Sequence, residues 1–158
     1  MKEERYFYVP NADRNNELPS EEATHALRVL RLQSGDDMFL MDGRGNFYHA
    51  EVSLATHKKC LYHIKETLPQ QKTWRGHIHL AIAPTKHIDR MEWLVEKATE
   101  VGFDEITFLH CAFSERKVLR TDRIEKIVIS AAKQSRKPWI PMVNELKSFK
   151  TFVQQPRE

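Results

Sequence analysis

The chain has 158 residues, of which 30% are charged and 41% apolar, and this length allows one large domain or two small ones. No apolar run approaches the length of a membrane span and no signal-peptide pattern follows Met1, so a soluble, cytoplasmic protein without a membrane partner is expected. The two cysteines, Cys60 and Cys111, lie far apart and outside any metal-ligand spacing, which predicts reduced thiols.

The net charge of +3 arises entirely in the second half of the chain. Residues 1–76 hold 11 basic and 11 acidic side chains, whereas residues 77–158 hold 14 and 11. The excess is densest in residues 115–137, with eight Lys or Arg side chains against three Asp or Glu. Such a segment favours a polyanionic partner, although a solvated helix face that happens to be basic explains it equally well.

The first part of the chain reads as mainly β-structure with one early helix. Residues 5–9 are strand-like, and a helix is predicted from Ser20 to near Gly35. Strand patterns follow at 37–42, 47–54 and 58–66, the first two joined by the hairpin turn Gly43-Arg44-Gly45-Asn46. Short strands at this spacing predict a small β-barrel.

On the early helix, Thr24, Arg28 and Arg31 are predicted to share one polar face, at positions i, i+4 and i+7. Two guanidinium groups one turn apart can straddle phosphates, so both arginines are candidate RNA contacts. The alternative is that they are surface side chains paired with Glu21 or Glu22.

Residues 69–73 contain few apolar side chains and predict a linker, which divides the chain into domains 1–72 and 77–158. In the second domain the hydrophobic period changes from 2 to alternating strand and helix. The expected order is strand 78–82, helix 89–102, strand 105–109, helix 122–136, strand 142–146 and a last amphipathic stretch from Ser148. This β-α-β-α-β-α run predicts an α/β domain with a parallel sheet.

The first helix of that domain carries the clearest signals. Asp89 and Glu92 are spaced as a capping box, and Gly102 is a helix stop. An apolar face is predicted from Met91, Leu94, Val95, Ala98 and Val101. The preceding loop therefore lies at the carboxyl end of a strand, where open α/β sheets bind ligands.

Polar residues at three successive connections are candidates for this site. Thr85, Lys86 and Arg90 follow the first strand, Ser114-Glu115-Arg116 follows the second, and Gln134 and Arg136 close the second helix. Lys97 is expected to pair with Glu100 at i, i+3 spacing. His77 and His79 share a strand face, a spacing found in some metal sites, but no third ligand is nearby and no metal is expected.

Several segments together resemble the RsmE family of 16S ribosomal RNA (uracil-N(3))-methyltransferases. They occur in the expected order over nearly the whole chain: His25–Arg31, Asp42-Gly43, Lys86 with Asp89–Glu92, Glu96–Gly102, Ser114–Arg116 and Ala131–Arg136.

The resemblance implies a PUA-like RNA-binding barrel followed by a SPOUT-class, knotted α/β methyltransferase domain that works as a homodimer with S-adenosylmethionine. It also implies that the partner is 16S rRNA or the small ribosomal subunit. The expected RNA contacts are Arg28, Arg31, Lys97 and Arg136. The residues expected to stabilise charge on the uracil carbonyls are Lys86, Arg90 and Arg116, with Glu100 or Gln134 as orienting groups.

Gly102 is the last of only five glycines, so no glycine-rich cofactor loop is visible in the second domain. We therefore expect the cofactor site of the family that this chain resembles to lie beyond Glu158. We also expect that the 158-residue chain alone neither binds S-adenosylmethionine appreciably nor methylates RNA. The alternatives are a non-catalytic RNA-binding module and, built around His77 and His79, a metal-dependent hydrolase.

Overall fold

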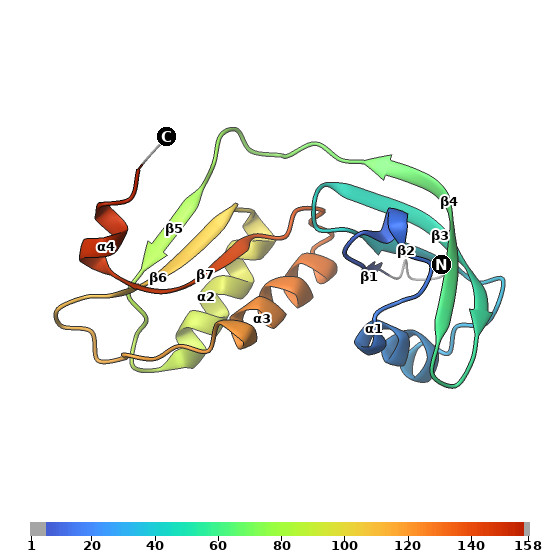
Figure 1. The fold of residues 1–158 in the computed structure, drawn as a ribbon, viewed down its shortest axis with the longest axis horizontal. Helices are drawn as coiled ribbons and strands as arrows, with labels where there is room; N and C mark the ends of the chain where they lie inside the picture. The colour runs from blue at the N-terminus through green and yellow to red at the C-terminus, as the bar shows by residue number, and fades with distance from the viewer. Residues whose placement is uncertain (1–5, 157–158) are drawn as a thin grey trace. The chain divides into compact units, whose positions relative to one another are not determined.

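The computed structural model describes residues 6–156, which form two compact units, Met1–Lys72 and Thr73–Glu158 (Figure 1). None of the helices in this described part of the chain is long and apolar enough to cross a membrane. Each unit has its own cluster of buried apolar side chains.

Unit 1 contains a four-stranded sheet in the order β1-β2-β3-β4. The strands are β1 (Tyr6–Tyr8), β2 (Asp37–Met41), β3 (Asn46–Ala55) and β4 (Cys60–Pro69). β1 is parallel to β2, and the other pairs are antiparallel. The predicted hairpin between β2 and β3 is confirmed, with Met41 opposite Phe47.

A short segment before the first helix extends this sheet beyond β4. Glu17 forms a bridge with Leu61, the Leu18 amide donates to the Cys60 carbonyl at 2.9 Å, and the Tyr62 amide donates to the Asn16 carbonyl at 2.8 Å. The strands and this segment surround a core that includes Phe7, Leu40 and Val52, all fully buried. The small β-domain predicted from the strand spacing is thereby formed.

The early helix is shorter and less regular than predicted. It starts at Ser20 as expected, runs as α1 (Ser20–Thr24), and continues as one π-helical segment, η2 (His25–Val29). The predicted end near Gly35 is wrong, because Arg31 has a φ of 54° and turns the chain. That turn brings Leu32 into the core at 4% exposure, with its amide donating to the Ala26 carbonyl.

This correction removes the predicted face shared by Thr24, Arg28 and Arg31. The α-helical spacing stops at Thr24, and Arg31 lies outside the helix in the left-handed region. Both arginines are exposed to solvent, but they are not one α-helical turn apart.

Unit 2 is a three-stranded, fully parallel sheet in the order β5-β6-β7, which confirms the predicted class. The elements are β5 (His79–Ile82), α2 (Ile88–Val101), β6 (Glu105–His110), α3 (Thr121–Gln134), β7 (Met142–Ser148) and α4 (Phe149–Val153). Helices α2 and α3 lie side by side on one face of the sheet (Figure 1). Their apolar stripes pack on Ile106 and Phe108 of β6, which are fully buried.

Helix α2 departs from its prediction at both ends of its apolar face. His87 is the N-cap, so Asp89 lies inside the first turn and no side chain caps the helix; the predicted capping box is wrong. Val101 is 79% exposed instead of buried, because the buried stripe runs Met91, Val95, Thr99 at i, i+4, i+8. The Thr99 hydroxyl is satisfied by donating to the Val95 carbonyl at 2.7 Å.

We predict that trypsin cuts the native chain first in the window 68–76, after Lys72 or Arg75, and releases two fragments that each stay folded. Residues 70–73 are exposed and belong to no helix or strand, whereas the two units have separate cores. Mass spectrometry of a digestion time course identifies the first site. A first cut after Lys117 or Arg120, in the long loop of unit 2, would contradict this boundary.

Candidate functional site

A pocket of about 710 Å³ lies in unit 2 at the carboxyl ends of β5 and β6. One wall is the loop after β5, one is the loop after β6, and Phe149 at the start of α4 adds a third side. The lining residues are Ala83, Pro84, Thr85, Lys86, Cys111, Ala112, Phe113, Ser114, Glu115 and Phe149. This is the edge at which the strand order predicted a ligand site.

Arg116 joins the two loops. Its Nε donates to the Thr85 carbonyl at 3.2 Å, and its Nη2 donates to the Lys86 carbonyl at 2.6 Å. The structure thus brings together Lys86 and Arg116, which are 30 residues apart in the sequence. Because the guanidinium group has five N–H donors, some remain for a ligand after these two bonds.

The edge of the pocket is positively charged. A neighbouring hollow of about 350 Å³ is lined by Lys86, Glu115, Arg116, Lys117 and Val118, that is, three cations and one carboxylate. Among the residues that the structure describes, none forms a hydrogen bond or ion pair with the Lys86 ammonium group. The site therefore suits an anionic ligand, or a ligand whose carbonyl oxygens gain negative charge.

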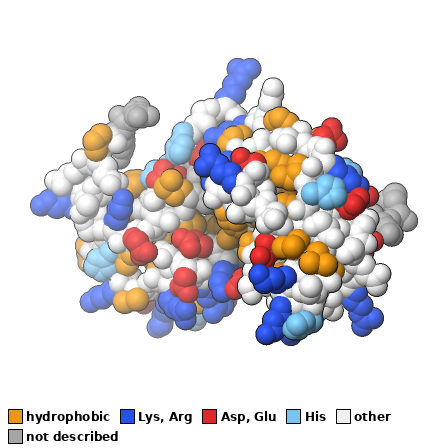
Figure 2. Space-filling view, turned by 45° about the vertical axis from the view of Figure 1, so that its right-hand side comes forward, with side chains coloured by type: hydrophobic (Ala, Val, Ile, Leu, Met, Phe, Trp, Pro, Cys, Tyr) orange, Lys and Arg blue, Asp and Glu red, His pale blue; other side chains and the backbone are white. Residues whose placement is uncertain are grey.

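Away from this edge, the basic segment 115–137 is partly neutralised. Arg120 pairs with Asp122 at 2.8 Å, an ion pair that lowers the pKa of the Asp122 carboxyl, and Arg123 pairs with Glu92 at 2.6 Å. Figure 2 shows Lys and Arg side chains interspersed with Asp and Glu side chains over the visible face. Within the predicted basic segment, Arg116 and Lys117 line a hollow together with Lys86.

The predicted site residues divide between the two edges of the sheet. Since α2 and α3 each bring the chain back antiparallel to the strands, their last turns lie at the amino edge. Glu100 is 12 residues after Ile88, or about 18 Å along α2 at 1.5 Å per residue. Gln134 and Arg136 are at the corresponding end of α3, so within one unit they do not converge on Lys86.

Two other candidates have defined surroundings. Lys97 donates to Glu100 at 2.9 Å, which confirms the predicted pair, and also to Glu96 at 2.8 Å; these two bonds raise the pKa of Lys97. A lysine held between two carboxylates is a poor phosphate contact. Arg90 is exposed in the first turn of α2 and is not among the described residues that line either hollow.

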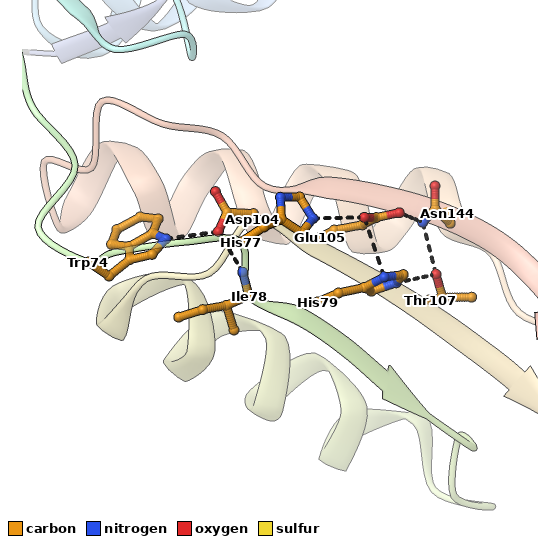
Figure 3. Close-up of polar contacts among 8 residues, drawn as sticks. All are labelled: Trp74, His77, Ile78, His79, Asp104, Glu105, Thr107 and Asn144. Carbon is orange, nitrogen blue, oxygen red and sulfur yellow. Dashed lines mark hydrogen bonds and ion pairs between the residues drawn. The ribbon is translucent and has the colours of Figure 1, made fainter. Parts of the chain in front are cut away.

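His77 and His79 take part in a polar network on the sheet face opposite α2 and α3 (Figure 3). The Glu105 carboxylate contacts His77 Nε2 at 3.0 Å and His79 Nδ1 at 3.4 Å, and accepts a hydrogen bond from Asn144. Desolvation raises the pKa of Glu105, but the bonds from Asn144 and His77 and the His79 charge outweigh it and lower the pKa. Within residues 6–156, no group of three or more metal-ligating side chains is arranged around an ion site.

A second set of polar contacts, at the amino edge of the sheet in unit 2, joins the segment before β5 to the loop after α2 (Figure 3). Asp104, just after α2, accepts hydrogen bonds at 2.8 Å from both the Trp74 indole and the Ile78 amide. The Trp74 ring lies over Gly102, which ends α2 with a φ of 115°. These contacts fix where β5 begins, and hence where its carboxyl end meets β6.

The sequence analysis missed the aromatic side chains of the pocket. Phe113 is 98% exposed and Phe149 is 53% exposed, and both line it. The candidate residues were polar or charged; Phe113 belongs to no periodic apolar pattern, and Phe149 belongs to the amphipathic stretch predicted from Ser148, where an apolar residue is expected to be buried. The available signal was an isolated aromatic residue in an otherwise polar loop directly after a strand.

Comparison with known families assigns both units. Residues 72–158 match the RNA methyltransferase domain model, and residues 18–64 match the RNA methyltransferase PUA domain model. The first match covers more than half of the chain and includes the whole pocket.

Individual relatives agree with these matches. The chain is 32% identical, over 81% of its length and 42% of the relative's, to "Ribosomal RNA small subunit methyltransferase E" of Synechocystis. The structure of a probable rRNA-methyltransferase from Porphyromonas gingivalis is 42% identical, with a TM-score of 0.90, over 96% of this chain and 64% of that one.

A putative methyltransferase from Legionella pneumophila, solved in complex with the bound cofactor SAM, is 25% identical with a TM-score of 0.87, over 99% of this chain and 68% of that one. The chain spans less than two thirds of the length of the Synechocystis and Porphyromonas relatives. A PUA domain followed by an α/β RNA methyltransferase domain, in this order and with these relatives, makes the chain a member of the RsmE family of RNA methyltransferases.

Proposed function

We propose that the protein methylates N(3) of a uridine in 16S ribosomal RNA, with S-adenosylmethionine as the methyl donor. The observation that carries the proposal is the pocket at the carboxyl ends of β5 and β6, where Arg116 fixes the loop that holds Lys86. It is supported by family membership, by the name of the Synechocystis relative, and by the SAM complex of the Legionella neighbour. A protein with this substrate acts in the cytoplasm.

The chemistry explains why two cations are useful at this site. Uracil N(3) carries a proton at neutral pH and normally pairs, so the base must leave its stack and lose that proton before it can accept a methyl group. The negative charge that develops is shared with the two carbonyl oxygens beside N(3). In this proposal that charge is stabilised by Lys86, which lines the mostly apolar pocket, and by the remaining donors of Arg116, which lines the neighbouring hollow.

The residues that line the pocket do not by themselves fit the methyl donor. An adenosine with a methionine tail requires close backbone approach, and none of the described lining residues is a glycine. We therefore assign cofactor contacts to no residue in 6–156, and we derive only the roles of Lys86 and Arg116 toward the base. Arg90 is proposed to assist them from the start of α2.

Glu100 and Gln134 keep their proposed orienting role only in a homodimer, which we also propose. They lie at the amino edge of their own unit, so they reach such a pocket only if it belongs to a second copy.

The test uses the protein expressed from its whole gene and small ribosomal subunits from a strain that lacks the gene. With S-adenosylmethionine, nucleoside mass spectrometry should detect N(3)-methyluridine in 16S RNA and little in 23S RNA. Binding to the RNA without methyl transfer would favour the alternative, a non-catalytic RNA-binding module. Methylation of another base would contradict the assigned chemistry.

RNA contact by unit 1 is tested by replacing Arg28 and Arg31 with alanine, singly and together. Both side chains are exposed, so the fold should be unchanged. The measured quantity is the slope of the logarithm of the RNA-binding constant against the logarithm of the salt concentration. If each arginine contacts one phosphate, each single substitution should reduce the magnitude of this slope by roughly 1, and the double substitution by roughly 2. Arg14→Ala, at another exposed arginine of unit 1, is the matched comparison; an unchanged slope in the double variant would remove RNA contact from the role of Arg28 and Arg31.

A further inference from the structure

Phe113 is the most unusual side chain of the pocket. It is 98% exposed, at the loop after β6 and three residues before Arg116. Single exposed apolar residues are common on protein surfaces and need no explanation. Phe113 differs because its ring shares a pocket with a second exposed aromatic ring, Phe149, and with the ammonium group of Lys86, which pairs with no residue in the described part of the chain.

The backbone around Phe113 is ordered on both sides. The Ser114 amide donates to the Cys111 carbonyl at 3.1 Å, and the Cys111 amide donates to the Ser114 hydroxyl at 2.9 Å, so residues 111–114 form a closed turn. On the other side, Arg116 is bonded to the loop after β5. The exposed Phe113 ring therefore projects from a turn that hydrogen bonds hold in place on both sides.

We propose that Phe113 is the stacking platform for the target uracil, a positioning residue for the proposed methyl transfer. The inference rests on the proposed function, because it assumes that a base enters this pocket. A base taken out of its stack loses its π-partners, and an aromatic side chain replaces them. A base stacked on Phe113 presents its edge, with both carbonyl oxygens, to groups that line the same pocket, and Lys86 is the cation among them.

Stacking on Phe113 and contact with a cation contribute differently to binding of the base. Stacking holds any base, since every base has a π-face, whereas the cations favour a base whose edge carries carbonyl oxygens. Uracil has a carbonyl on each side of N(3), so the combination selects the base and orients the reacting nitrogen.

The test compares two ligands of equal charge, a uridine octanucleotide and an abasic octanucleotide of the same length. The wild-type protein should bind the uridine octamer about tenfold more tightly than the abasic octamer. In Phe113→Ala this difference should fall to the part that the Lys86 contact with the base contributes, while the salt dependence stays the same, because phosphate contacts are untouched. Phe113→Trp should restore it, and Phe113→Leu, which keeps apolar bulk without a π-face, should not.

Trp93→Ala is the matched control, since it removes an exposed aromatic ring, 64% exposed, from α2 of the same unit, and Trp93 is not among the described residues that line either hollow; the difference between the two octamers should persist in this variant. Equal losses for both octamers in Phe113→Ala, or rescue by Phe113→Leu, would overturn the stacking role. The proposed function is read separately from N(3)-methyluridine formation by the wild-type protein. Methylation with no effect of Phe113→Ala would refute this inference alone, and stacking without any methylation would refute the proposed function alone.

Discussion

Arg116→Ala is expected to lower kcat/KM for methylation of small-subunit RNA about 100-fold, the size of effect seen when one preorganised charge-stabilising donor is lost. The guanidinium group both holds the Thr85–Lys86 backbone through two hydrogen bonds and contributes its own charge to the pocket edge. Its loss should leave the melting temperature nearly unchanged, because no core side chain contacts depend on it.

Two variants sharpen this experiment. Arg116→Lys keeps the charge but cannot form the forked pair of bonds to two carbonyls, so an intermediate loss of about tenfold is expected. Arg120 lies in the same loop, and among the residues that the structure describes its side chain pairs only with Asp122, so the activity of Arg120→Ala should be close to wild type. If Arg116→Ala and Arg120→Ala behave alike, Arg116 has no special role.

Gly102→Ala is expected to destabilise unit 2 by about 3 kcal/mol, from backbone strain and overpacking together. The φ of 115° at Gly102 disfavours any side chain, and an added Cβ would lie 2.5 Å from Cζ3 and 2.8 Å from Cε3 of Trp74. The ring cannot simply move, because its indole nitrogen donates to Asp104. Chemical denaturation of the whole chain, or of a fragment that begins at Thr73 and so keeps Trp74, measures the change.

The steric and the conformational contributions to the cost of Gly102→Ala can be measured separately. Gly76→Ala has a similar positive φ, 74°, and nothing within 4 Å of its added Cβ, so it should cost only about 1 kcal/mol. In the background Trp74→Ala, the additional cost of Gly102→Ala should fall to that same value. A Gly102→Ala cost that equals the Gly76→Ala cost in the wild-type background would contradict the proposed packing of Trp74 on Gly102.

The sequence predicted the regular elements well, because their signals are local. Strands β5 and β6 are short runs rich in apolar residues, α3 has an apolar stripe, and Gly102 ends α2 as expected. Topology then placed Lys86 and Arg116 at one edge, since the carboxyl ends of parallel strands meet there.

The errors come from non-local packing. The periodicity of Ala23, Ala26, Leu27 and Leu30 is compatible with a longer α-helix, but burial of Leu32 requires a turn at Arg31. Placing Glu100 and Gln134 beside Lys86 within one unit conflicts with the predicted β-α-β order itself, since the helix between two parallel strands returns the chain to the amino edge. Phe113 was not predicted as a site residue, because an exposed aromatic side chain indicates a binding site only once the pocket around it is known.

Photocrosslinking with 4-thiouridine in small-subunit RNA, followed by mass spectrometry of the crosslinked peptides, determines whether the target uracil binds at the carboxyl ends of β5 and β6. The predicted result is crosslinks in residues 111–118, centred on Phe113, that disappear in Phe113→Ala while crosslinks to unit 1 persist. Crosslinks confined to unit 1, or to parts of unit 2 that are neither in 111–118 nor beside Glu100 and Gln134, would contradict the assignment of this pocket.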